Sequence, residues 1–286
     1  MRRVPAPLAI LLAVATVQFL AWVVVLPALQ PPDEHTHFAY TQRLLETGHK
    51  PPIDGDPPRY SPELEAAWID AGLKPIIGNV SGRPYWTSLD ERLWHAHDAK
   101  LGPHARDAAT GPTGASRNPP LYYAYAGIAY AVEWNGSFFD RLFAMRIANL
   151  PLYLLTIVMT WVLAGQLFGR DALWPRTVAA GAVAVQPQFA FVAAGVSPDP
   201  FLTAIWAVFT VLAVHVVQRG VTYRTAAGLG ALALASIATH PRGAPLAVLA
   251  LLAVGLGLRR RLGPVSRRTL ALGGAAAAVL LAVILA

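Results

Sequence analysis

Long apolar runs alternate with short polar segments along most of the chain. The first run extends from Ala6 to Leu29, and a polar region occupies residues 30–118. The later runs are Pro119–Trp134, Leu142–Phe168, Leu173–Val196, Phe201–Gln218, Thr225–Thr239, Ala244–Leu258 and Thr269–Ala286. A helix of about 20 apolar residues crosses the hydrocarbon core of a bilayer. The pattern therefore predicts an all-α polytopic membrane protein.

The run Pro119–Trp134 decides the number of spans. It begins with two prolines and carries four tyrosines and a tryptophan, and such aromatic side chains favour the membrane interface. If it forms an interfacial or re-entrant helix, seven spans remain, with the N-terminus in the cytoplasm. Eleven arginines then lie in cytoplasmic segments, against the single acid Asp171. This agrees with the accumulation of Lys and Arg on the cytoplasmic side of membrane proteins.

Charge and composition narrow the class further. The formal net charge is +7, but the excess is explained by membrane orientation, so nucleic acid is not expected as a partner. Cysteine is absent, which excludes disulfides, thiolate metal sites and a cysteine nucleophile. The composition, rich in Ala and Arg and poor in Lys, is typical of bacteria. We expect the cytoplasmic membrane of a bacterium as the location.

Three parts of the chain follow from this pattern. Residues 1–29 form a cytoplasmic stub and the first span, residues 30–141 a large extracytoplasmic loop with juxtamembrane helices, and residues 142–286 six further spans. Residues 30–118 hold twelve of the 16 acidic residues and six of the eight histidines. Within them, Glu34–Glu46 is predicted to be a short helix. The last run ends at Ala286 without a following charge, which favours a chain truncated at its C-terminus.

The densest polar cluster, PPDEHTHF, begins just beyond the first span. In it, Asp33 could act as a general base on an acceptor hydroxyl, because partial desolvation raises the basicity of a carboxylate. Alternatively, Asp33, Glu34 and His37 could hold a divalent cation. A third interpretation is that the Asp33 side chain caps the helix that follows.

Other polar clusters are predicted on the same side of the membrane. The segment NPPLYYAY contains Asn118, Tyr122 and Tyr123. These residues are interpreted either as an interfacial aromatic belt or as support for a binding site. Arg141 and Arg146 follow it; Arg141 is expected to reach lipid headgroups, whereas Arg146, flanked by apolar residues, suits a phosphate.

Two outer turns between later spans complete the set. Asp199 lies in the turn VSPDP, where it could cap a helix, and His240 and Arg242 lie in the turn HPRG. All these ionisable groups are predicted at one membrane surface. An intramembrane ionisable residue is costly and usually functional.

Taken together, the PDE…HF, PPLYY, MR and SPD elements resemble the GT-C class of polytopic glycosyltransferases. This class includes protein O-mannosyltransferases and aminoarabinose transferases, and the chain is most similar to a related family of bacterial polytopic membrane proteins. The resemblance covers roughly residues 6–258 and implies inverting sugar transfer from a polyprenyl-phosphate donor. The acceptor would be a hydroxyl of a glycan, lipid or protein outside the cytoplasm.

The resemblance also implies roles for individual residues. Asp33 would be the general base or a metal-associated carboxylate, with Glu34 as its neighbour. Arg146 would bind the donor phosphate, together with Arg242 and His240. The supporting residues would be His37, Asp199, Tyr122, Tyr123 and Asn118. No certain cofactor is implied beyond the divalent cation already considered.

Two other classes of protein remain open from the sequence. A transporter or flippase component for a lipid-linked or anionic solute would place polar groups near the bilayer midplane, often in repeated halves. Here the polar groups are predicted at the outer rim, and the PDE and SPD segments are not repeated. A non-catalytic membrane scaffold would not require Asp33, Arg146 and Asp199 on one surface.

Overall fold

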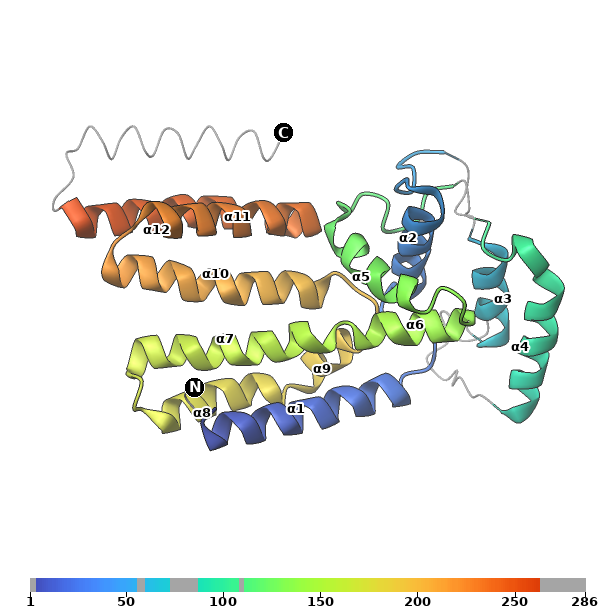
Figure 1. Ribbon diagram of the computed structural model, residues 1–286, viewed down its shortest axis with the longest axis horizontal. Coiled ribbons are helices and arrows are strands. Elements are labelled where there is room, and N and C mark those ends of the chain that lie inside the picture. Colours follow the sequence, from blue (N-terminus) through green and yellow to red (C-terminus); the bar gives the residue numbers. More distant parts are fainter. Residues whose placement is uncertain (1–3, 56–59, 73–86, 108–110, 263–286) are drawn as a thin grey trace. The chain divides into compact units, whose positions relative to one another are not determined.

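The computed structural model describes residues 4–55, 60–72, 87–107 and 111–262, and within these ranges the regular structure is helical (Figure 1). The helices of the first half are α1 Ala6–Val25, α2 Glu34–Thr47, α3 Pro62–Asp70, α4 Ser88–Leu101, η1 Gly102–His104, α5 Leu121–Val132 and α6 Phe138–Ile147. Those of the second half are α7 Leu150–Phe168, α8 Leu173–Ala184, α9 Pro187–Ala193, α10 Asp199–Arg219, α11 Tyr223–Thr239, η2 Pro241–Gly243 and α12 Pro245–Leu262.

Four helical segments in the described ranges are long and apolar enough to cross a membrane. They are Ala6–Val25, Phe138–Phe168, Asp199–Arg219 and Pro241–Leu262. The run expected at Leu173–Val196 is instead two helices, because α8 ends at Ala184 and Pro187 begins α9. The run expected at Thr269–Ala286 lies outside the described residues. The described part of this membrane protein is therefore all-helical and contains four candidate spans.

Local sequence accounts for several helix boundaries. The Thr87 hydroxyl accepts a hydrogen bond from the Asp90 backbone N–H, and the Asp90 carboxylate accepts one from the Thr87 N–H. Ser137 and Asp140 form the same capping box at the start of α6. In each helix the box therefore supplies acceptors for two backbone N–H groups that have no partner within the helix. The helix predicted at Glu34–Glu46 is confirmed as α2, which ends at Gly48 with φ 72°.

The chain divides into two compact units. The loop unit comprises Ala15–Pro151 and Pro187–Pro200. In it α2 packs on α5, α5 on α6 and α3 on α4, and the rings of Phe38 and Phe138 meet with centroids 4.5 Å apart. The loop unit therefore has its own aromatic core, and it carries most of the predicted site residues.

The bundle unit comprises Met1–Val14, Leu152–Gln186 and Phe201–Ala286. Here α11 and α12 lie side by side (Figure 1). Gly257 allows close packing on α10, because an added Cβ would lie 2.5 Å from Cγ1 of Val216. The Arg261 guanidinium donates to the Val221 carbonyl over 3.0 Å and so ties the end of α12 to the turn before α11.

Candidate functional site

A buried ion pair organises the turn between α1 and α2. Arg146 in α6 donates to both carboxylate oxygens of Glu34, over 2.8 and 2.6 Å. It also donates to the carbonyls of Leu26, Pro27 and Val23, over 2.8, 2.9 and 3.4 Å. A guanidinium has five N–H donors, so these five contacts use all of them. Arg146 has no donor left for a phosphate in this arrangement.

The hydrogen-bonding capacity of the Glu34 carboxylate is also fully used. Besides the two bonds from Arg146, its carboxylate accepts the backbone N–H of Leu29 and that of Val196, each over 2.9 Å. Its relative exposure is 0% and that of Arg146 is 4%. Burying two charges carries a desolvation cost, and here that cost is offset because each polar atom of the pair has a hydrogen-bond partner. The pair joins α6, the turn before α2 and the segment before α10.

Asp33, the sequence neighbour of Glu34, has the opposite environment. It is exposed and occupies the N-cap position of α2 in the left-handed region, with φ 56° and ψ 14°. Its backbone carbonyl accepts from the N–H groups of Thr36 and His37 over 2.9 and 3.1 Å, but its side chain makes no capping bond. The interpretation in which the Asp33 side chain caps α2 is therefore wrong, and the carboxylate faces outward.

Aromatic side chains that sequence reasoning did not single out lie close to Asp33. The ring of His35 meets those of Trp68 and Tyr60 edge to face, with centroids 4.3 and 5.7 Å apart. Burial lowers the pKa of His35, opposed by the charges of Asp33 and Glu34. Burial and the Asp33 charge both raise the pKa of Tyr60. The Asp33 carboxylate is therefore flanked by neutral aromatic groups.

His37 belongs to a second cluster, in which PDEHTHF meets NPPLYY. The Tyr123 hydroxyl lies 2.9 Å from Nδ1 of His37 and accepts from Nδ2 of Asn118 over 2.8 Å. The Tyr123 oxygen has a second lone pair and its own proton, so it either donates to His37 Nδ1 or accepts from it, according to the His37 tautomer. Tyr40 stacks on Tyr123 with ring centroids 3.6 Å apart. Burial raises the pKa of Tyr123.

The segment before α10 closes this part of the loop unit. Asn149 donates to the Gly195 carbonyl over 2.7 Å, and an added Cβ at Gly195 would lie 2.5 Å from that of Pro31. Tyr122 is completely buried, and burial raises its pKa, against hydrogen bonding to Asn149 and the Ser197 backbone. These contacts hold the Gly195–Ser197 backbone against the turn that carries Asp33.

Asp199 lies where the Gly195–Ser197 backbone enters α10. Its backbone N–H donates to the Ser197 hydroxyl over 3.2 Å, so the acceptor in this turn is Ser197, and a capping role of the Asp199 side chain stays a prediction. Its charge contributes to the raised pKa of Tyr123. The structure thus brings Asp199, Tyr122, Tyr123, Asn118 and His37 into one unit with Asp33, Glu34 and Arg146.

The remaining two predicted residues, His240 and Arg242, belong to the bundle unit. Nδ1 of His240 accepts a hydrogen bond from the Arg242 backbone N–H over 3.0 Å at the start of η2. The Arg242 side chain is exposed. The predicted role of these two residues in binding a phosphate stays a prediction.

The predicted ligands Asp33, Glu34 and His37 do not form a divalent-cation site in this structure. Within the described ranges, no three His, Asp or Glu side chains come close enough to share a metal ion. Glu34 is engaged by Arg146, and His37 Nδ1 by Tyr123. Asp33 therefore lacks the two neighbours that the metal hypothesis requires.

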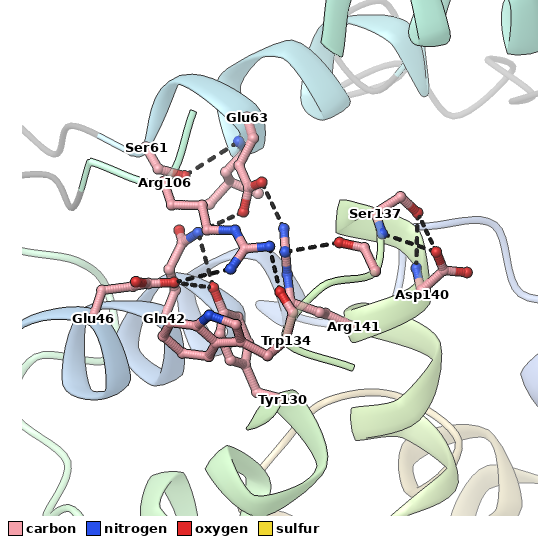
Figure 2. Close-up of polar contacts among 12 residues, drawn as sticks. Gln42, Glu46, Ser61, Glu63, Arg106, Tyr130, Trp134, Ser137, Asp140 and Arg141 are labelled. Atoms are coloured by element: carbon pink, nitrogen blue, oxygen red, sulfur yellow. Dashed lines mark hydrogen bonds and ion pairs between the residues drawn. The ribbon is translucent and has the colours of Figure 1, made fainter. Parts of the chain in front are cut away.

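A second buried ion pair was missed because its partners are far apart in the sequence (Figure 2). Arg141 donates to Glu63 over 2.6 Å and to the Gly136 carbonyl over 3.0 Å. Arg141 has 1% and Glu63 has 2% relative exposure. The expectation that Arg141 reaches lipid headgroups is wrong, because Glu63 of α3 supplies a buried carboxylate.

Polar contacts extend from Glu63 across the loop unit (Figure 2). Gln42 donates to Glu63 and lies 3.4 Å from the Tyr130 hydroxyl, which donates to Glu46 over 2.8 Å. Burial raises the pKa of Glu63, and the charge and hydrogen bond of Arg141 oppose this shift. The network joins α2, α3, α5 and α6, and Asp33 is not part of it.

These features define a polytopic helical membrane protein with a polar cluster built on the turn after its first candidate span. The chain belongs to the family described as "Predicted membrane protein (DUF2142)", whose model matches residues 17–286. No curated protein and no solved structure matches it. Family membership agrees with the membrane location and names no reaction.

Proposed function

We propose that the protein is a membrane glycosyltransferase that moves a sugar from a polyprenyl-phosphate donor to an acceptor hydroxyl at the extracytoplasmic face. The observation that carries the proposal is the contrast between two adjacent carboxylates. Glu34 is buried with every acceptor position filled, whereas Asp33 is exposed and held in a left-handed conformation. Backbone strain of this kind concentrates at functional sites.

In this proposal Asp33 takes the proton of the acceptor hydroxyl. The hydroxyl oxygen attacks the anomeric carbon, the bond from that carbon to the donor phosphate breaks, and the lipid phosphate leaves with the electron pair. One displacement inverts the anomeric configuration. His37 supports the site through its contact with the Tyr123 hydroxyl, 2.9 Å from Nδ1, which in turn accepts from Asn118.

The donor phosphate needs a cation with available N–H groups. Arg146 has used its five donors, so we assign it the role of positioning Glu34 and the turn that carries Asp33. Arg117 is exposed, directly precedes Asn118 and forms no ion pair within the described part of the chain. Arg117 is therefore our candidate phosphate ligand in the loop unit, since a guanidinium matches phosphate oxygens in bidentate geometry.

The deciding experiment compares Asp33→Asn with Asp54→Asn, a substitution of another exposed loop carboxylate. Each purified chain is placed in proteoliposomes with a panel of tritium-labelled polyprenyl-phosphate hexoses and pentoses. We expect Asp33→Asn to lower transfer by about 100-fold or more, as loss of a general base does, and Asp54→Asn to leave it unchanged. Full transfer by the Asp33→Asn chain would remove the catalytic assignment.

We also propose that α8 with α9, α11 and the run Thr269–Ala286 cross the membrane, giving seven spans with a cytoplasmic N-terminus. The native chain has no cysteine, so single cysteines report sidedness directly. Thr47→Cys should react with a membrane-impermeant maleimide added to intact cells, and Arg260→Cys should react only after permeabilisation. The reverse pattern would invert the topology and place Asp33 on the cytoplasmic side.

A further inference from the structure

A groove of about 560 Å³ lies in the loop unit, between α5 and the first part of the candidate span Phe138–Phe168. Apolar side chains form most of it, among them Ile128 and Val132 from α5 and Phe143 and Ile147 from α6. Its volume is within the range of small-molecule sites, roughly 300–1,000 Å³. The groove is distinct from the cluster around Asp33, because no residue of that cluster lines it.

The apolar walls are open to the surroundings. Ile128 is 65% exposed, Val132 76% and Phe143 49%, and contiguous apolar surface of this kind is unfavourable in water. One wall belongs to a 31-residue candidate span, which exceeds the roughly 20 residues needed to cross hydrocarbon. Asp140 and the buried Arg141 lie near the N-terminal end of this span, which we take as the end that extends beyond the hydrocarbon. A bilayer placed around the rest of this span would put the groove where headgroups meet the outermost part of the acyl chains.

The ionisable residues that line the groove, apart from Tyr125, are both acids, Glu133 and Asp140. Asp140 is held in place by the Ser137 backbone N–H and hydroxyl, which both donate to its Oδ2 over 2.8 Å. Glu133 follows the last residue of α5 as its C-cap. An anionic headgroup would meet like charge here, whereas an ammonium group finds two carboxylates.

We propose that this groove binds a bilayer phospholipid with an ammonium headgroup, one chain lying along Ile128 and Phe143 and the ammonium group at Glu133 and Asp140. The occupant is a lipid because the groove is continuous with a membrane-crossing helix, and its headgroup is set by the two acids. The proposal does not depend on the transferase assignment. It is a site separate from the one that would take a phosphate donor.

The test uses the full chain, purified in detergent and mixed with equal amounts of phosphatidylethanolamine and phosphatidylglycerol that carry identical acyl chains. Bound lipid is counted by native mass spectrometry. We expect phosphatidylethanolamine to be retained over phosphatidylglycerol by about fivefold, a modest electrostatic preference. In the Glu133→Gln/Asp140→Asn double variant the ratio should fall to about one. The asparagine keeps an acceptor oxygen for Ser137, so the helix cap survives.

A steric variant separates the groove from the headgroup effect. Ala129→Trp fills the groove and should abolish retention of both lipids, whereas Ala99→Trp, on an exposed face of α4, should not. Equal retention of the two lipids by the native chain would overturn the headgroup assignment. Undiminished retention by a folded Ala129→Trp chain, monodisperse on size exclusion, would overturn the site itself.

Discussion

The guanidinium of Arg146 forms a bidentate ion pair with the carboxylate of Glu34, although 112 positions separate the two residues in the chain. One carbonyl in the last turn of α1 and two in the turn that follows complete the guanidinium's hydrogen bonding. This contact sets the course of the backbone just before Asp33. The neighbouring acid is exposed, so the two carboxylates of the PDE motif have different environments.

Replacement of Arg146 should act on folding before it acts on substrate binding. Arg146→Ala leaves Glu34 buried without its partner, and breaking a buried pair typically costs about 3–5 kcal/mol of unfolding free energy. We expect a large drop in the thermal unfolding midpoint in detergent, with Glu65→Gln, a change at an exposed acid, as the control. Native stability combined with weaker binding of a polyprenyl phosphate would instead restore Arg146 as a phosphate ligand.

Asp33→Gly should separate stability from activity. Asp33 has φ 56°, a conformation that costs an L-residue about 1 kcal/mol and glycine almost nothing. We expect the unfolding free energy to stay level or rise by up to about 1 kcal/mol, while sugar transfer is lost with the carboxylate. Chemical denaturation and the transfer assay measure the two effects. A strongly destabilised Asp33→Gly chain would show that the side chain is structural.

The stability of the loop unit should depend on pH through Glu63. Burial raises the pKa of Glu63 above its usual 4.5, so the folded chain binds this proton more tightly than the unfolded chain does. This contribution to stability is present below pH 4.5 and declines as pH rises through the raised pKa. Glu63→Gln should make the unfolding midpoint less dependent on pH over that range. An identical pH profile in native and Glu63→Gln chains would contradict the shift.

Two glycine substitutions should have opposite effects. Gly195→Ala places a Cβ 2.5 Å from that of Pro31, and overpacking typically costs about 1–3 kcal/mol. Gly230→Ala in α11 meets nothing within 4 Å and should stabilise the helix by up to about 1 kcal/mol. Thermal unfolding of both variants checks the pair. Tolerance of Gly195→Ala would mean that the segment before α10 does not pack closely on Pro31.

Part of the site follows from local sequence. The motif PDEHTHF identified Asp33 and His37, and NPPLYY identified Tyr123 and Asn118, because clustered polar residues beside an apolar run are costly unless they have a purpose. The sequence could not distinguish the environments of Asp33 and Glu34. Adjacent residues have similar surroundings in the chain, and only the left-handed turn at Asp33 separates an exposed carboxylate from a buried one.

The sequence by itself determined that this is a helical membrane protein, since apolar runs of sufficient length must satisfy their backbone groups internally in lipid. It also determined several helix starts, through side chains a few residues apart. Only the tertiary structure decided what Arg141 and Arg146 bind, because their partners Glu63 and Glu34 lie 78 and 112 positions away. A guanidinium's availability depends on which acceptors the fold places around it, and no local pattern encodes that.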